Sequence, residues 1–262
     1  ISDPENPTEV TPAGKAATIS FEHVNYRYHG AEKLALEDID FSAKSGETVA
    51  IIGGTGSGKS TLVNLIPRLY DVESGTIKID GVSITDMTQY NLRELMGFVP
   101  QKAMLFSGTI RENMQYGKAD ATDEMIWKAL EIAQAKDFVS EMEEGLDSHV
   151  EQSGGNFSGG QRQRLAIARA LVKPADIYVF DDSFSALDFK TDAKLRQALK
   201  QNMKESITVL VAQRVSTVMD ADMILVLDKG KLVGKGTHDE LLKTNETYQE
   251  IVHSQLREED LA

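Results

Sequence analysis

Consecutive apolar residues, separated by stretches with helical spacing, dominate the second half of the chain. Ile177–Asp181, Ile207–Ala212 and Met223–Asp228 are apolar at neighbouring rather than alternate positions, which is typical of strands buried on both faces. A similar run, Thr48–Ile52, leads directly into glycines and then a helical pattern. Because strands alternate with helices in this order, we predict βα units and a mostly parallel sheet.

Residues 18–42 follow a different pattern, in which apolar and polar positions alternate. A period of two is typical of strands that bury one face, so this stretch predicts an antiparallel sheet. Residues 102–157 carry no strand pattern, and Asp123–Phe138 within them has apolar residues at helical spacing. We therefore expect an inserted helical subdomain from about 102 to 172.

The two ends of the chain differ from this core in composition. Residues 1–17 are polar, contain three prolines and do not begin with Met, so we expect a linker or tail from a fragment of a longer protein. Residues 251–262 are also polar, and we expect a solvated C-terminal tail. The folded domain is then expected to cover residues 18–250.

Composition excludes several classes of function. The 262 residues include 28 Lys and Arg against 41 Asp and Glu, a net charge of −13. Such an acidic surface argues against unaided binding of nucleic acid, because Lys and Arg are needed to neutralise phosphates, and we expect no nucleic-acid partner. The sequence has no Cys, which excludes disulfides, Cys-ligated zinc and thiol catalysis. It also has no run of about 18 apolar residues that would span a bilayer.

A glycine-rich segment follows the predicted strand Thr48–Ile52 and satisfies the pattern GxxxxGK[ST]. Glycines let backbone N–H groups turn inward around phosphate oxygens, and the next helix offers its positive N-terminus. The lysine is expected to reach the β- and γ-phosphates, and the serine hydroxyl to bind Mg²⁺. We therefore expect ATP and Mg²⁺ as ligands. The nucleotide-binding residues expected here are Gly53, Gly54, Thr55, Gly56, Ser57, Gly58, Lys59, Ser60 and Thr61.

Two further segments complete the pattern of a phosphate-binding enzyme. Asp181 ends a buried strand and is expected to hold Mg²⁺ together with Ser60. A second helix opens with small residues that leave its N-terminus accessible to an anion. These residues are Ser158, Gly159, Gly160 and Gln161.

Together these segments resemble the ATP-binding cassette (ABC) ATPase family over about residues 18–245. This resemblance implies an α/β fold: a P-loop NTPase (RecA-like) core with a mostly parallel sheet, an antiparallel β subdomain and an inserted α-helical subdomain. Ser158–Gln161 is similar to the signature motif of the family. It implies head-to-tail dimers that hold each ATP between the phosphate loop of one subunit and the signature helix of the other, so a second nucleotide-binding domain is the expected partner.

The resemblance also implies roles for single residues. Gln101 matches the Q-loop, which would contact Mg²⁺ and the attacking water. Tyr28 is placed like the aromatic residue that stacks on adenine, although a half-buried strand tyrosine is the alternative. The D-loop of the family is matched by Ser185, Ala186, Leu187 and Asp188.

Two segments narrow the resemblance to ABC exporters. They are Leu105–Asn113, after the Q-loop, and Gly236–Leu241, near the end of the chain. The chain is thus similar to the nucleotide-binding domain of an exporter. Its expected place is the cytoplasmic face of the cell membrane, beneath a transmembrane domain of the same full-length chain.

Two catalytic positions depart from the family pattern. Where active members carry a general-base Glu after the metal-binding Asp, this chain has Asp182, and where they carry a γ-phosphate-contacting His, it has Gln213. Glu151–Gly154 also differs from the usual sequence before the signature. Because the signature itself is intact, the pattern resembles one subunit of a heterodimeric exporter, with a slow site of its own and a signature that completes the partner's site.

Three alternatives remain open at this point. A homodimeric exporter could tolerate Asp182 and Gln213 and hydrolyse ATP slowly at two equal sites. A regulatory module could signal by ATP occupancy alone, without hydrolysis. A soluble ABC ATPase of DNA maintenance is disfavoured by the acidic surface and by the exporter-like Leu105–Asn113.

Overall fold

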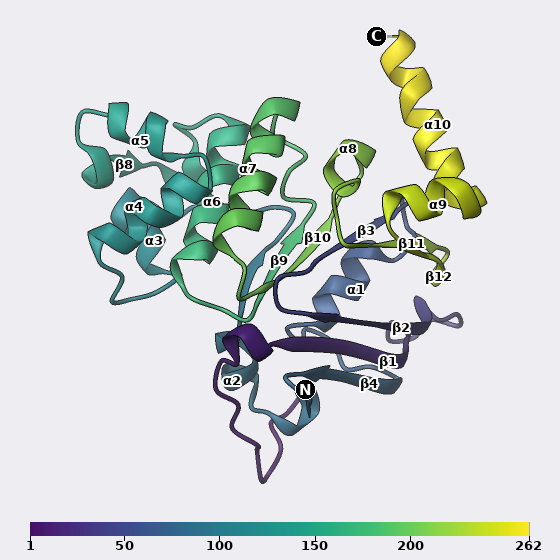
Figure 1. Ribbon diagram of the computed structural model, residues 1–262. Helices are drawn as coiled ribbons and strands as arrows, with labels where there is room; N and C mark the ends of the chain where they lie inside the picture. The colour runs from purple at the N-terminus through teal and green to yellow at the C-terminus, as the bar shows by residue number, and fades with distance from the viewer. Residues whose placement is uncertain (262) are drawn as a thin grey trace.

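A ten-stranded mixed sheet runs through residues 1–261, the part of the chain that the computed structural model describes (Figure 1). Its strand order is β5-β4-β1-β2-β12-β11-β3-β10-β9-β6. The mostly parallel core is confirmed, because neighbouring strands from β11 to β6 all pair in parallel. These strands are β11 (Met223–Asp228), β3 (Thr48–Gly53), β10 (Ile207–Val211), β9 (Ile177–Asp181) and β6 (Met96–Val99).

The antiparallel part is confirmed at the other end of the same sheet. β1 pairs antiparallel with both β2 and β4, and its burial alternates along the strand as the sequence pattern predicts. The two parts are continuous, because β12 pairs antiparallel with β11 and meets β2 at Lys231 and Glu37. The strands are β1 (Thr18–Tyr26), β2 (Leu36–Lys44), β4 (Ser74–Ile79), β5 (Val82–Ser83) and β12 (Lys231–Gly236).

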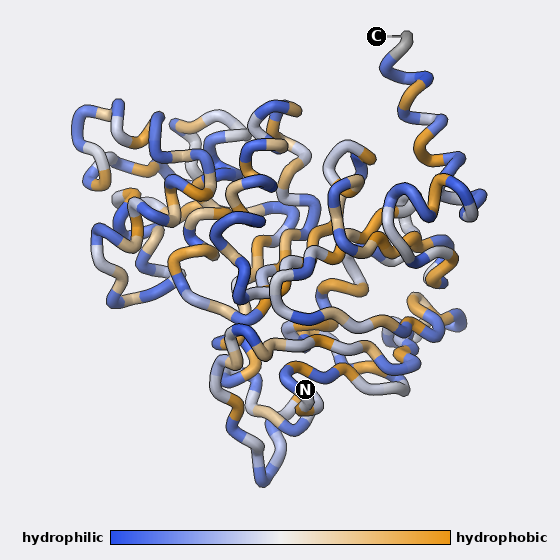
Figure 2. The backbone as a smooth tube through the Cα atoms, in the orientation of Figure 1, coloured by the Kyte–Doolittle hydropathy of each residue, from blue (hydrophilic) through white to orange (hydrophobic). Residues whose placement is uncertain are grey.

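Two apolar cores lie on opposite faces of the parallel strands. In β3, Ile51 belongs to one core and Ile52 to the other, and Val179 and Phe180 divide in the same way in β9. Figure 2 shows the apolar residues concentrated on these strands, with polar residues on the outer loops. Each parallel strand therefore needs apolar residues at neighbouring positions, because each face of the sheet is covered by its own layer of helices. The helices outside the helical subdomain and before the C-terminal helix are α1 (Lys59–Leu65), α2 (Gln89–Glu94), α7 (Phe189–Asn202), α8 (Val215–Val218) and α9 (His238–Thr244).

Helices α3 to α6 gather at one side of the sheet (Figure 1), where the inserted helical subdomain was expected. The sequence interpretation was wrong on one point here, because residues 108–109 and 149–150 form a small two-stranded sheet. The elements of the subdomain are α3 (Ile110–Gln115), α4 (Asp123–Ile132), α5 (Lys136–Glu141) and α6 (Gly159–Val172), the strands β7 (Gly108–Thr109) and β8 (His149–Val150), and the 3-10 turns η3 (Gly145–Asp147) and η4 (Gln152–Gly154). Two further 3-10 turns, η1 (Gly14–Ala16) and η2 (Ile84–Asp86), lie outside the subdomain.

The helix predicted over Asp123–Phe138 is also broken in the structure. α4 ends at Ile132, and Gln134 adopts a left-handed backbone with φ +62°. Its side-chain amide donates to the Ile132 carbonyl at 3.2 Å, and Ala133 and Ala135 on either side are fully buried. The break is thus a turn that is fixed by packing of its two alanines, which a helical spacing of apolar residues does not reveal.

Segments near both ends of the chain contact the domain, and our domain boundaries stay predictions. In the N-terminal segment, the Ala13 N–H donates to Asp176 Oδ2 at 2.8 Å and the Gly14 N–H to Oδ1 at 3.1 Å. At the other end, α10 (Glu246–Leu261) begins on the domain and extends away from it (Figure 1). Residue 250, where we expected the domain to end, therefore falls inside a helix.

Asp176 also faces a second carboxyl group, that of Asp80. Asp80 Oδ1 accepts a hydrogen bond from the Thr18 N–H at 3.0 Å, whereas its Oδ2 is buried without a partner. Burial and then the neighbouring Asp176 carboxyl raise the pKa of Asp80 to about 7. The folded protein thus holds a proton at Asp80 that the unfolded chain, with the ordinary pKa of 3.8, releases at lower pH.

We predict that Asp80→Asn stabilises the protein at pH 8. Because the pKa of Asp80 is raised in the folded state, its protonated form contributes stability that is lost as the pH rises from about 4 to about 7. Asn keeps the oxygen for Thr18 and removes the charge, so the gain in Tm over the natural protein should grow across that range. Asp222→Asn, which also alters a carboxylate that accepts a backbone N–H, is the control in thermal unfolding at several pH values. An equal gain at pH 5 and pH 8 would contradict the prediction.

Candidate functional site

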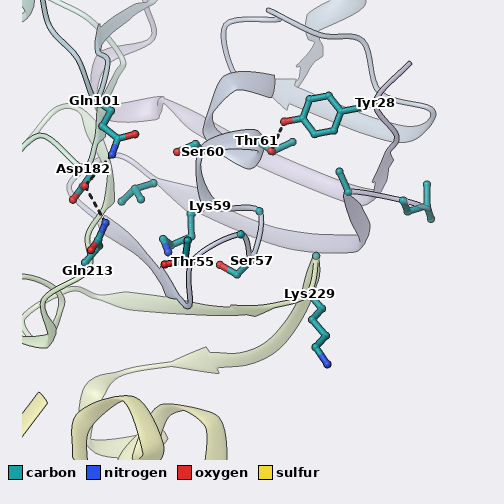
Figure 3. A pocket seen from close by; sticks show the side chains of 16 residues that line it. Tyr28, Thr55, Ser57, Lys59, Ser60, Thr61, Gln101, Asp182, Gln213 and Lys229 are labelled. Carbon is teal, nitrogen blue, oxygen red and sulfur yellow. Dashed lines mark hydrogen bonds between the residues drawn. The ribbon is translucent and has the colours of Figure 1, made fainter. Parts of the chain in front are cut away.

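A pocket of about 600 Å³ opens where the carboxyl ends of the parallel strands meet the start of α1 (Figure 3). All of the residues from Thr55 to Thr61 line it, as do the side chains predicted to act in catalysis or stacking. The lining residues are Tyr28, Leu34, Ala35, Thr55, Gly56, Ser57, Gly58, Lys59, Ser60, Thr61, Gln101, Asp182, Val211, Gln213, Lys229 and Gly230. The fold therefore brings together segments that lie up to 202 positions apart in the sequence, from Tyr28 to Gly230.

Packing explains two of the glycines in the loop. A Cβ on Gly53 would lie 2.4 Å from the Leu227 carbonyl oxygen of the neighbouring strand. Gly58 has φ +106°, and a Cβ there would lie 2.8 Å from the Leu36 side chain. Gly54, by contrast, has no atom within 4 Å of where its Cβ would be, so the loop leaves open space at that position.

Lys59 opens α1 and bends back over the loop. Its Nζ donates to the Gly53 carbonyl at 2.7 Å and to the Gly54 carbonyl at 3.0 Å. Burial lowers the pKa of Lys59, and the nearby carboxylates of Asp182 and Asp181 act in the opposite direction. The loop thus holds a cation beside its own backbone, which suits a phosphate ligand.

Ser60, which lines the pocket, contacts the buried Asp181, although the two are 121 residues apart in the sequence. The Ser60 hydroxyl donates to Asp181 Oδ1 at 3.1 Å. Burial raises the pKa of Asp181, and the hydrogen bond from Ser60 opposes this. A hydroxyl and a carboxylate are the hard oxygen ligands that Mg²⁺ takes, and the Ser57 hydroxyl in the same loop is buried with no hydrogen-bond partner. These observations fit a magnesium–nucleotide ligand.

The three residues predicted to act in hydrolysis form one cluster. Gln101 Nε2 and Gln213 Nε2 approach the same oxygen, Oδ2 of Asp182, at 3.4 and 3.3 Å (Figure 3). Asp182 is 7% exposed and has φ +52°, a backbone region that Asp adopts more readily than most residues. Burial raises the pKa of Asp182, against the effects of Lys59 and of the two amides. The carboxylate is therefore held by two neutral donors at the edge of the pocket.

Tyr28 stands at the opposite end of the pocket. Its hydroxyl lies 2.6 Å from the Thr61 hydroxyl, and the residue is 42% exposed. Tyr26 and Tyr70 contact it at steep interplanar angles of 79° and 80°. These edge contacts fix the ring at the rim of the pocket, where a planar base could stack on it.

The signature residues lie apart from this pocket, and none of the four lines it in the described part of the chain. Ser158 caps α6 through a reciprocal pair of hydrogen bonds with Gln161, at 3.2 and 3.0 Å. A Cβ on Gly160 would lie 3.3 Å from the Ala186 carbonyl oxygen, so the start of α6 packs on the predicted D-loop.

The predicted D-loop lies between the signature and the Asp182 cluster. Ser185 Oγ donates to the Asp182 carbonyl at 3.1 Å, and Leu187 is buried. Asp188 ends the loop and caps α7 by accepting a hydrogen bond from the Thr191 N–H at 2.7 Å. This loop thus contacts both the signature residues and the Asp182 cluster.

Sequence reasoning missed the part of the pocket that Lys229 and Gly230 form. The Gly230 N–H donates to the Ser57 carbonyl at 2.9 Å, and a Cβ on Gly230 would lie 2.3 Å from the Ala35 carbonyl oxygen. The only sequence signal is a Lys-Gly pair in the turn between two strands, which does not by itself indicate a ligand. Only the pairing of β11 beside β3 brings this turn to the phosphate loop.

Comparison with known families and structures identifies relatives of this chain. A family model described as ABC transporter matches residues 36–185, more than half of the chain. The chain belongs to the ABC transporter family. Its ABC ATPase fold, with a large mixed sheet and flanking helices, matches an Atm1-family ABC exporter solved with ATP bound, at a TM-score of 0.91 and 36% identity over 97% of this chain and 44% of that one.

Curated relatives from several bacteria are similar over nearly the whole chain. An ABC transporter ATP-binding protein of Mycobacterium tuberculosis is 45% identical over 97% of this chain and 44% of its own length. An ATP-dependent lipid A-core flippase of Pseudomonas fluorescens is 47% identical over 86% of this chain and 38% of its own length. The chain therefore spans less than half the length of the curated relatives it matches. None of the helices in residues 1–261 has both the length and the apolar character needed to span a membrane.

We predict that Gly53→Ala destabilises the domain and that Gly54→Ala does not. A methyl group added at position 53 would overlap the Leu227 carbonyl, and overpacking of this kind costs about 1–3 kcal/mol. A methyl group at position 54 enters open space, so Gly54→Ala is a matched control in the same loop. Urea unfolding of the two variants measures the difference. Equal stabilities would show that the loop does not pack against β11 as described.

Proposed function

We propose that this chain is the ATP-binding domain of a heterodimeric ABC exporter, in which its own ATP site turns over slowly. The observation that carries this proposal is the cluster of Asp182, Gln101 and Gln213, in which a short carboxylate is shared by two neutral amides. The phosphate loop, Ser60 and Asp181 support binding of magnesium–ATP at the same site. The pocket is thus suited to bind magnesium–ATP but to hydrolyse it slowly.

The length of Asp182 is the first reason for slow hydrolysis. Its carboxylate stands one methylene short of that of a Glu, which withdraws the base from water by about 1 Å, and a misplacement of that size can cost on the order of 10²-fold. General-base catalysis as a whole is worth about 10²–10⁴-fold. Since Gln101 and Gln213 both donate to one oxygen of Asp182, that oxygen is also less available to accept a proton.

The neutrality of Gln213 is the second reason. An amide can donate a hydrogen bond to the γ-phosphate, but it cannot carry a positive charge or move a proton as a histidine does. When bound, Mg²⁺ would neutralise charge on the β- and γ-phosphates, with Ser60 and Asp181 as its protein ligands. The remaining residues then serve binding: Lys59 at the phosphates and Tyr28 at the adenine.

The intact signature supports a second role, completion of the partner's ATP site. Ser158–Gln161 presents a capped helix start away from the chain's own pocket, as a head-to-tail pair requires. We propose a non-identical nucleotide-binding domain as the partner, and a transmembrane domain in the remainder of the full-length chain. This arrangement places the domain at the cytoplasmic face of the membrane. The exporter and flippase names of the similar proteins favour outward transport or flipping.

We predict a small loss of ATPase activity for Asp182→Asn and a large loss for Ser158→Ala in the paired complex. Asn tolerates the left-handed backbone as Asp does and removes only the charge, so steady-state ATPase should fall less than about twofold. Ser158→Ala should lower it by about 10²-fold, because the partner's ATP loses a preorganised donor.

Ser158→Ala also removes a helix cap, so a matched control is needed. Thr237→Ala removes the equivalent capping box of α9, which Thr237 forms with Glu240 outside the pocket, and should leave the ATPase unchanged. A larger loss from Asp182→Asn than from Ser158→Ala would sink the heterodimer proposal. Equal, partial losses from both would favour a homodimer with two slow sites, and no turnover by the natural chain alone or paired would favour a regulatory module.

We also predict that this chain's own ATP site gains ATPase activity when Asp182 and Gln213 are both replaced by the residues that active family members carry. Asp182→Glu with Gln213→His restores a longer base and a group able to carry charge, and should raise single-turnover hydrolysis at this site by about 10-fold or more. Asp182→Glu alone is the control and should give a smaller gain, because Gln213 still occupies the position of the cation. Failure of the double variant to exceed the natural chain would show that another feature limits hydrolysis.

A further inference from the structure

The backbone that carries Gln213 is held from outside the pocket by a residue of the C-terminal helix. Gln255 Oε1 accepts a hydrogen bond from the Val215 N–H at 2.8 Å. Its Nε2 donates to the Gln213 carbonyl at 2.6 Å. One side-chain amide therefore bridges the two residues that flank Arg214.

The bridged segment lacks a cap of its own. α8 begins at Val215 and spans four residues, and its N-cap residue Arg214 makes no side-chain hydrogen bond to the helix start. Helix N-terminal N–H groups need partners from elsewhere, and Gln255 supplies one for Val215. The Arg214 side chain instead donates to the Leu187 carbonyl in the predicted D-loop at 3.0 Å and to the Phe184 carbonyl just before this loop at 2.8 Å.

α10 presents Gln255 from a firmly docked base. Tyr248, near the start of the helix, is fully buried, and its hydroxyl lies 2.5 Å from His238 Nδ1. Ile251 and Val252 pack against the same core that covers one face of β10. Leu256, the residue after Gln255, is 52% exposed, so Gln255 lies where the docked part of the helix ends.

We propose that Gln255 is a positioning residue for the nucleotide site, acting through the backbone of Gln213. Its two hydrogen bonds hold the peptide groups on both sides of Arg214, and so set where the Gln213 amide lies relative to Asp182 and to the terminal phosphate of ATP. This inference rests on the proposed function, in which Gln213 donates to the γ-phosphate. ADP lacks that phosphate, so the position of Gln213 should affect the affinity for ATP and leave the affinity for ADP unchanged.

The test measures the preference for MgATP over MgADP at this chain's own site. Competition of each nucleotide against photolabelling of this chain by azido-ATP, in the full-length transporter, separates the two affinities and the two sites. Gln255→Ala should lower the ATP-over-ADP preference about three- to tenfold, the size expected for one or two neutral hydrogen bonds, with ADP affinity unchanged within about twofold. Gln255→Glu keeps the acceptor for Val215 but sets a carboxylate oxygen against the Gln213 carbonyl, so it should lose at least as much.

Gln249→Ala is the matched control. Gln249 lies on the same helix and also donates to a backbone carbonyl, that of Leu242 at 2.7 Å, but it makes no hydrogen bond to residues 213–215 in the described structure. It should leave the preference unchanged. An equal loss in Gln249→Ala would assign the effect to general loosening of α10 and would overturn the proposal.

Variants of Gln213 separate this inference from the proposed function. Gln213→Ala should lower the preference, and Gln255→Ala should then add no further loss. If Gln213→Ala lowers the preference but Gln255→Ala does not, or if the two losses add, the positioning role is overturned while the γ-phosphate contact stands. If Gln213→Ala has no effect, the γ-phosphate contact itself fails, and the role of Gln255 falls with it.

Discussion

Two adjacent carboxylates at the end of a fully buried strand set the electrostatics of this domain. All five residues of β9 are buried, and Asp181 ends the strand with Asp182 directly after it. Burial raises the pKa of both groups, and Lys59 is a cation that both face. The hydrogen bond from Ser60 opposes this rise for Asp181, and the two amides oppose it for Asp182. A magnesium–nucleotide ligand bound here, as we propose, would meet charged groups that are already held in place.

The parts of this arrangement that sequence could predict are those that rest on local chemistry. Neighbouring apolar residues in Ile177–Asp181 indicated burial on both faces, and the glycine spacing before Lys59 indicated a phosphate loop. The alternating pattern of β1 likewise indicated a one-sided antiparallel strand. Each of these signals is contained in a few consecutive residues, so no knowledge of distant contacts was needed.

The parts that sequence did not reveal depend on distant contacts. The left-handed Gln134 breaks a helix whose apolar spacing is otherwise continuous, because the alanines beside it are buried by other elements. Lys229 and Gly230 reach the phosphate loop only because β11 lies beside β3. Gln255 sits in a segment whose polar composition suggested a tail. A glutamine that bridges two backbone groups about 40 residues away has no local signature.

The N-terminal segment and the C-terminal helix contact the parallel strands at opposite edges of the sheet: one where the strands begin, the other where they end. The N-terminal segment is tied to Asp176, directly before β9, whereas α10 is tied to the segment that follows β10. β9 is packed on both faces, and packed cores do not deform gradually. Residues 213–215 are held by hydrogen bonds of side-chain amide and guanidinium groups and also by the burial of Val215 in the apolar core. The frame of the site is therefore fixed by the packing of β9 on both faces, whereas the connection from α10 to Asp182 runs through the hydrogen bonds of Gln255 and Gln213.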